Sequence, residues 1–108
     1  MSIKKLEKKS WKAYFNGLSK SYMHHERTDY AEIRVFSPEI GAQPETSWLP
    51  LGGITYDDKD DLLEVNVEHL DHLVYQPEEI YVDETPDGVL TTLEIIRKDG
   101  IKEIIELR

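Results

Sequence analysis

The sequence predicts an α+β fold in which an N-terminal helix packs on a strongly bent antiparallel sheet, or on a partly open small barrel, of about six strands. Three observations carry this prediction: an apolar stripe at helical spacing near the N-terminus, alternating apolar and polar residues from residue 30 onward, and connections too short for parallel crossovers. The 108 residues contain no internal repeat and no linker, so we expect a single domain over residues 1–108.

The N-terminal helix is predicted over residues 10–23. Its apolar stripe follows the i, i+3, i+4, i+7, i+11 spacing of one helix face and consists of Trp11, Tyr14, Phe15, Leu18 and Tyr22. Ser10 can cap the start of the helix. Residues 2–9 are expected to extend it or to fray.

The strands are recognised by a change of period from helical spacing to two. They are expected over residues 30–36, 46–49 continuing toward 54–56, 63–67, 73–75 and 80–82, with a loop over residues 37–44. Pro50 and the pair Gly52 and Gly53 indicate a bulge, a bend or an edge position in the second of these segments.

The last hairpin can be predicted down to its register. A two-residue Asp-Gly turn would pair Ile96 with Glu103, whereas a three-residue turn with Gly100 in the left-handed conformation pairs apolar residues with each other. We therefore prefer the three-residue turn. It sets Leu93 opposite Ile105, Thr91 opposite Leu107 and Arg97 opposite Ile101, with Arg97 diagonal to Glu103 and Glu94 diagonal to Lys102.

The net charge of −9 is unevenly distributed. Residues 1–27 form a basic helical segment of charge +5, residues 28–108 an acidic antiparallel sheet of charge −14, and residues 57–87 alone carry −11. We expect no nucleic-acid binding, because phosphate neutralisation needs a basic footprint. No apolar run can span a membrane, no secretory signal precedes the helix, and the absence of cysteine excludes disulfides and thiol chemistry, so we expect a cytoplasmic protein.

The acidic string at residues 57–61 is the first candidate site, because clustered carboxylates suit hard cations such as calcium. Its spacing differs from an EF-hand loop, since Leu62 stands where glycine is required. A solvated turn between two strands is the alternative, and aspartate is a favoured turn residue.

The second candidate lies at residues 68–72, where histidines and carboxylates meet. His69, His72 and Asp71 could hold a divalent metal, the one cofactor that the sequence suggests. On a strand His69 and His72 point to opposite faces, so they would converge only if the chain bends. The alternative is a strand end and turn. Because no nucleophile or phosphate-binding motif is present, the sequence favours a non-enzymatic role.

The string Leu49-Pro50-Leu51-Gly52-Gly53-Ile54-Thr55-Tyr56-Asp57-Asp58-Lys59-Asp60-Asp61, followed by Asp71-His72-Leu73, resembles a small bacterial domain family of unknown function. The resemblance covers nearly the whole chain, including the tryptophan-bearing helix and the terminal hairpin. It implies a compact bacterial domain and brings no activity or ligand with it. The shared pattern singles out six positions as binding candidates: Tyr56, Asp57, Asp60, Asp61, Asp71 and His72.

Three functional hypotheses remain open. The first is an interaction or regulatory domain that presents its acidic sheet edge or the loop at 57–61 to a basic protein partner or to another copy of itself. The second is a divalent-metal or small-ligand site around His72 and Asp71. The third is an acidic inhibitor that mimics DNA through residues 57–87.

Overall fold

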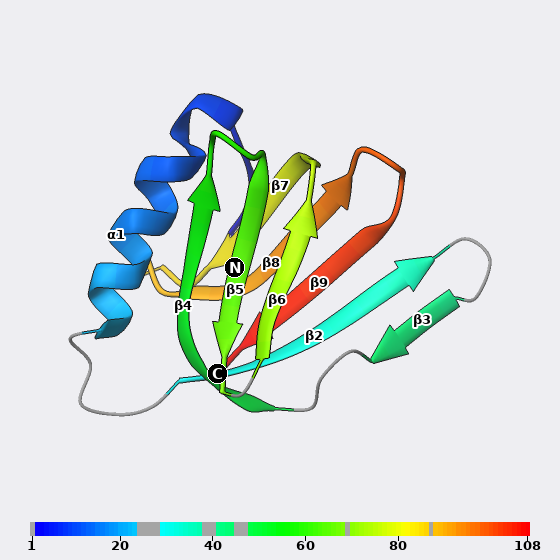
Figure 1. The fold of residues 1–108 in the computed structure, drawn as a ribbon. Coiled ribbons are helices and arrows are strands. Elements are labelled where there is room, and N and C mark those ends of the chain that lie inside the picture. The colour runs from blue at the N-terminus through cyan, green and yellow to red at the C-terminus, as the bar shows by residue number, and fades with distance from the viewer. Residues whose placement is uncertain (1, 24–28, 38–40, 45–47, 69, 87) are drawn as a thin grey trace.

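The computed structural model describes residues 2–23, 29–37, 41–44, 48–68, 70–86 and 88–108. These residues form an α+β fold with one α-helix and one antiparallel sheet of nine strands (Figure 1). The elements are β1 (Ser2–Leu6), a 3₁₀ turn (Lys8–Ser10), α1 (Trp11–Met23), β2 (Tyr30–Ser37), β3 (Gly41–Pro44), β4 (Leu49–Asp57), β5 (Leu62–Val67), β6 (Leu70–Tyr75), β7 (Pro77–Glu84), β8 (Leu90–Arg97) and β9 (Lys102–Leu107).

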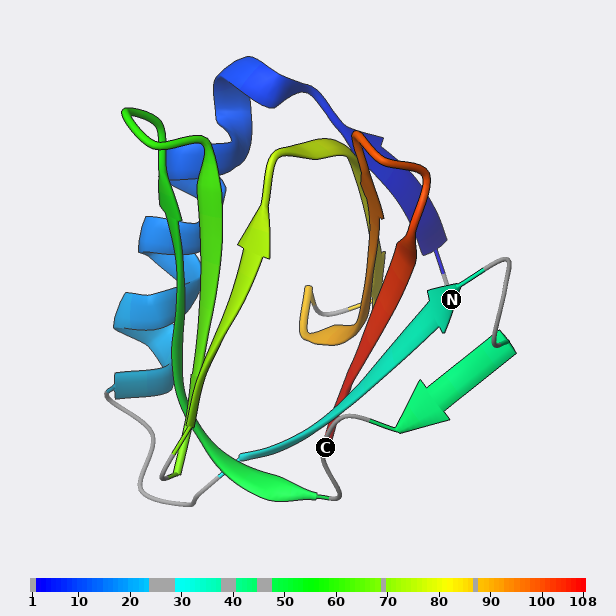
Figure 2. The same cartoon turned by 45° about the vertical axis from the view of Figure 1, so that its right-hand side comes forward.

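The sheet is strongly bent, as the sequence predicts. Its strand order is β1-β7-β8-β9-β2-β4-β5-β6, with β3 paired to β2 off this path. Figure 2 shows β4, β5 and β6 on one side of a curved interior and β8 and β9 on the other. The sheet does not close, because β1 and β6 end the path without pairing with each other. The core fills the interior with inward side chains such as Leu63, Val65, Leu93, Ile95 and Ile105.

The helix lies beside β4 and buries its aromatic stripe, which confirms the predicted element (Figure 1). Trp11 and Phe15 are 1% and 0% exposed, while Tyr14 and Leu18 are partly buried against the core. The Trp11 indole donates a hydrogen bond to the Leu6 carbonyl oxygen at 3.2 Å. The stripe thus joins the helix to the sheet. The side chain of Tyr22 lies outside the described residues.

At the start of the helix, two features differ from the prediction. Residues 2–6 form strand β1 instead of extending the helix, so the basic segment 1–27 is only partly helical. This strand pairs with β7, from Ser2 opposite Glu84 to Leu6 opposite Ile80, a partner more than 70 residues away that local patterning does not reveal. The Ser10 hydroxyl, expected to cap the helix, donates to the Glu7 carbonyl oxygen.

The described residues form nine strands rather than about six. Besides β1, residues 41–44 form the short strand β3 instead of a loop, because they pair with Arg34–Ser37 of β2. Glycine and proline give this segment no local strand signal. The irregularity expected near Gly52 is confirmed, since the β4–β5 register shifts between Leu51 and Gly53.

The terminal hairpin has the predicted register. Gly100 has a φ of +88°, the Arg97 N–H donates to the Ile101 carbonyl oxygen at 2.8 Å, and Leu93 lies opposite Ile105. Both diagonal charge pairs form, Arg97 with Glu103 at 3.3 Å and Lys102 with Glu94 at 2.7 Å. The three-residue turn is therefore confirmed.

A sharp corner joins β6 to β7 at Gln76, whose φ is +50°. The Gln76 N–H donates to the Asp61 carbonyl oxygen, and the Gln76 carbonyl oxygen accepts from the Lys98 N–H, each at 2.9 Å. Because of this corner, consecutive strands have different partners: β6 pairs with β5, and β7 pairs with β8.

Replacing Tyr14 with phenylalanine is expected to remove a pH-dependent contribution to stability. The hydrogen bond from the Tyr14 hydroxyl at 2.7 Å, aided by Lys4, holds the pKa of Glu84 below its ordinary value despite partial burial. A carboxylate with a lowered pKa stabilises the fold above the pKa of the unfolded chain, and the effect is lost as the pH falls through the folded-state pKa.

We expect Tyr14→Phe to lower the free energy of unfolding by about 1–2 kcal/mol at pH 7, since the bond is to a charged group. The difference from wild type should shrink as the pH falls through the lowered pKa of Glu84, because protonation removes the charge that the Tyr14 hydroxyl stabilises. Urea unfolding at pH 7 and pH 3 measures both values. An equal difference at the two pH values would show that the Glu84 charge is not involved.

Candidate functional site

The acidic turn between β4 and β5 is held by contacts within the chain. The Asp57 carboxylate accepts hydrogen bonds from the backbone N–H groups of Lys59 and Asp60, at 2.9 and 3.4 Å. Asp58 forms an ion pair with Lys12 at 3.5 Å. These contacts are those of a turn whose charge is partly balanced by the basic N-terminal segment.

Tyr56 and Asp61 lie at the base of this turn. The Tyr56 hydroxyl donates to Asp61 at 2.6 Å, and Lys8 approaches the same carboxylate oxygen at 3.5 Å. Burial, followed by the nearby Asp61 carboxylate, raises the pKa of Tyr56 well above its ordinary value. Tyr56 therefore stays protonated and acts as a hydrogen-bond donor. Its edge-to-face contact with Trp11, 5.2 Å between ring centres, connects the turn to the helix.

The structure places Asp71 and His72 on opposite faces of β6. Asp71 is exposed and accepts a hydrogen bond from the Asn66 amide at 2.8 Å, whereas His72 points into the curved interior. His69 lies outside the described residues. Within the described part of the chain no three histidine, aspartate or glutamate side chains gather as metal ligands would.

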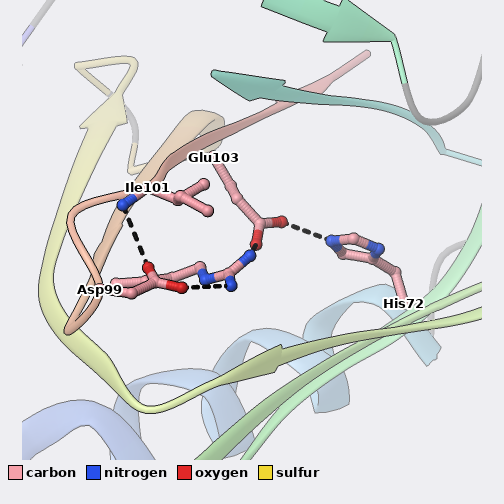
Figure 3. Close-up of polar contacts among 5 residues, drawn as sticks. His72, Asp99, Ile101 and Glu103 are labelled. Atoms are coloured by element: carbon pink, nitrogen blue, oxygen red, sulfur yellow. Dashed lines mark hydrogen bonds and ion pairs between the residues drawn. The ribbon is translucent and has the colours of Figure 1, made fainter. Parts of the chain in front are cut away.

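His72 belongs instead to a polar network centred on the buried Glu103 (Figure 3). The sequence predicted its Arg97–Glu103 pair but not the link to His72. Its Nε2 atom lies 2.5 Å from Oε1 of Glu103, whose side chain is 1% exposed. Oε2 of the same carboxylate accepts from Arg97 at 3.3 Å, and Arg97 also contacts Asp99 at 2.6 Å. The Ile101 N–H, and then Arg97, lower the pKa of Asp99. The network ties β6 to β8 and β9 across the interior.

One feature of the sequence indicates a buried polar contact at Glu103. Glu103 occupies an inward position of β9, in the alternation that also buries Ile105 and Leu107. A charged residue at such a position must find partners, because an unpaired buried carboxylate is costly. Its partner His72 lies 31 residues earlier, so the pairing depends on the bent sheet.

The outer side of β6 is the exposed edge of the sheet. Leu73 and Tyr75 are 36% and 60% exposed, and Leu70 is also exposed. Since the Gln76 N–H points toward β5, the alternation of an antiparallel ladder directs the backbone groups of Asp71, Leu73 and Tyr75 away from β5. Nothing in the described residues pairs with that edge.

The other two edge strands carry features that discourage pairing. Among the described strands, β1, β3 and β6 each have a single neighbour. Edge lysines, prolines and short length protect natural sheets from added strands. β1 contains Lys4 and Lys5, and β3 has four residues ending at Pro44. β6 has six residues with neither lysine nor proline, and Asp71 is its one acidic residue, so it is the least protected of the three edges.

The fold defines a small α+β domain with an antiparallel sheet that does not close. Residues 2–108 match the family of unknown function DUF5335, and the chain belongs to that family. It is also similar to an uncharacterized protein of Aquifex aeolicus (strain VF5), with 40% identity over 109 residues that cover 100% of this chain and 94% of the relative. These matches confirm the resemblance found in the sequence. No solved structure matches the chain.

The only α-helix in the described residues, α1, has 13 residues and is neither long nor apolar enough to cross a membrane.

Proposed function

We propose that the protein is an interaction domain that binds an extended, basic segment of a partner protein by adding it as a strand to β6. The observation that carries the proposal is the unpaired edge of β6, with its exposed Leu73 and Tyr75. In strand addition the backbone hydrogen bonds supply affinity and alternate side chains supply specificity. The backbone groups of Asp71, Leu73 and Tyr75 are available for such a ladder.

The side chains around this edge favour a partner whose added strand carries both basic and apolar residues on the outer face of the sheet. On that face Asp71 lies opposite Asn66, and Leu73 lies opposite Glu64. A lysine or arginine on the outer face of the added strand would meet these carboxylates, and an apolar residue two positions along, on the same face, would pack on Leu73 and Tyr75. A second copy of the chain is a poorer occupant, because it would bring together two proteins of charge −9.

The proposal can be tested with a blocked eight-residue peptide in which pairs of lysines alternate with pairs of valines, so that each face of the added strand carries both residue types. We expect saturable binding that shifts the amide NMR signals of β6 and slows hydrogen exchange at Asp71, Leu73 and Tyr75, the residues that face away from β5. Exchange at Val74, whose N–H already faces β5, should change much less. Binding should weaken with salt, because the carboxylates near β6 are exposed.

The matched variants are Leu73→Pro and Val89→Ala. Proline at residue 73 removes an N–H that points away from β5, so the β5–β6 ladder should survive while the edge is blocked. We expect at least about tenfold weaker peptide binding and an unchanged melting profile. Val89 is an exposed apolar residue outside β6, and its variant should bind normally.

Three results would contradict the proposal: equal binding of a peptide with glutamate in place of lysine, binding unaffected by Leu73→Pro, or protection of the β6 edge without peptide in a dimer detected by sedimentation. The last result would identify a second copy of the chain as the occupant.

A further inference from the structure

Asp83 of β7 is a buried carboxylate with an unsatisfied oxygen. Its side chain faces away from the core, opposite Thr92 of β8 and Ile3 of β1, yet the residue is only 9% exposed. Its Oδ1 atom has no hydrogen-bond partner among the described residues. Such an oxygen is costly for a folded protein, and each instance calls for a physical explanation.

The carboxylate borders a small hollow on the face of β1, β7 and β8. The hollow has a volume of about 60 Å³ and is lined by Ile3, Tyr81, Val82, Asp83, Thr92 and Glu94. It combines apolar groups with two carboxylates and two hydroxyls, and the Tyr81 hydroxyl donates to Glu79 at 3.3 Å. Its volume equals roughly the space of two water molecules in the liquid, which suits one small polar head group and little more.

The neighbouring cations of the chain are engaged elsewhere. Lys5, on the β1 edge of this face, lies 2.9 Å from Glu79, and Lys102 lies 2.7 Å from Glu94. Lys4 pairs with Glu84. Within the described residues, therefore, no lysine or arginine satisfies Oδ1 of Asp83.

We propose that this hollow binds a primary ammonium group, carried either by a lysine side chain or by a small free amine. An ammonium group has three N–H donors and no acceptor, so it matches the oxygens of Asp83, Glu94 and Thr92, while the Tyr81 hydroxyl already donates to Glu79. Ile3, which lies opposite Asp83 on this face, would contact the methylene groups next to the nitrogen. A metal ion is a poorer match, because only two carboxylates line the hollow and hard cations take six or more oxygens.

The site is separate from the proposed strand-binding edge. It lies on β7 and β8, whereas β6 pairs with β5 on the opposite side of the curved interior (Figure 2). The two proposals can therefore fail independently.

The test is an amide NMR titration with n-butylammonium chloride, with sodium chloride at equal ionic strength as the reference. We expect saturable shifts at residues 81–83 and 92–94 with the amine and not with sodium. A second arm uses lysine blocked at both its α-amino and carboxyl groups, together with its Nε-acetylated form. If only butylammonium binds, the ligand is a small free amine. If butylammonium and blocked lysine both bind and Nε-acetylated lysine does not, the ligand is the lysine head group.

Asp83→Asn is the decisive variant, with Glu32→Gln as a control carboxylate outside the hollow. We expect Asp83→Asn to weaken amine binding at least tenfold and, by removing an unpaired buried charge, to raise Tm by about 4 °C. Glu32→Gln should bind as wild type does. The proposal is wrong if neither amine gives saturable shifts, if sodium gives the same shifts, or if Asp83→Asn binds amines normally.

Discussion

Replacing Glu103 with alanine is expected to lower the free energy of unfolding by about 3–5 kcal/mol. The Glu103 carboxylate is fully buried, and both its oxygens have partners, His72 on β6 and Arg97 on β8. Removing it leaves a buried imidazole and part of a guanidinium without their acceptor, and it opens a cavity among Ile105 and its neighbours. For a domain of this size the fall in Tm should be at least about 12 °C, measured by thermal unfolding followed by circular dichroism.

A double variant separates the loss of one partner from the loss of both polar groups. When both members of a buried pair are replaced by apolar residues of similar volume, stability is often unchanged or improved. We therefore expect His72→Leu combined with Glu103→Leu to lie within about 1 kcal/mol of wild type, because Arg97 keeps its contact with Asp99. If the double variant is as unstable as Glu103→Ala, the network contributes through its specific geometry, and the explanation from unpaired charge is wrong.

The parts of the fold that the sequence predicted are those set by neighbouring residues. The stripe from Trp11 to Leu18 defines the helix, and Gly100 together with the apolar alternation defines the terminal hairpin and its charge pairs. Strand β1 was missed because its partner, β7, lies more than 70 residues away and the lysines of β1 give no strand signal. β3 was missed for a similar reason, since it is a strand only through its pairing with β2.

The sequence predicts where the candidate residues lie but not which side chains they contact. Their positions on the turn and on β6 follow from periodicity, but the partner of each side chain depends on how far the sheet bends. Asp71 and His72 are adjacent, and the pleat sends them to opposite faces, one toward Asn66 and the other toward Glu103. Nor can sequence alone distinguish an exposed edge such as β6 from an inner strand, because the distinction rests on the strand order.

The docking of the helix provides the second large expected effect on stability. Trp11 is the residue where α1 meets the sheet: its indole donates to the Leu6 carbonyl oxygen, and its ring meets Tyr56 edge to face. Trp11→Ala removes the largest side chain of this contact and leaves a cavity that the surrounding strands can fill only in part.

We expect Trp11→Ala to lower the free energy of unfolding by about 3–5 kcal/mol and Trp11→Phe by about 1–2 kcal/mol. Phenylalanine keeps an aromatic ring against Tyr56 and loses the indole hydrogen bond, so the comparison separates packing from hydrogen bonding. Urea unfolding followed by circular dichroism measures both variants, and Trp48 remains as a fluorescent probe. Equal losses in the two variants would mean that the bond to Leu6, and not the ring, holds the helix on the sheet. Tyr56 also donates a hydrogen bond to Asp61, so a displaced helix should change the acidic turn as well. We expect amide NMR shifts at residues 57–61 in Trp11→Ala and much smaller shifts in Trp11→Phe.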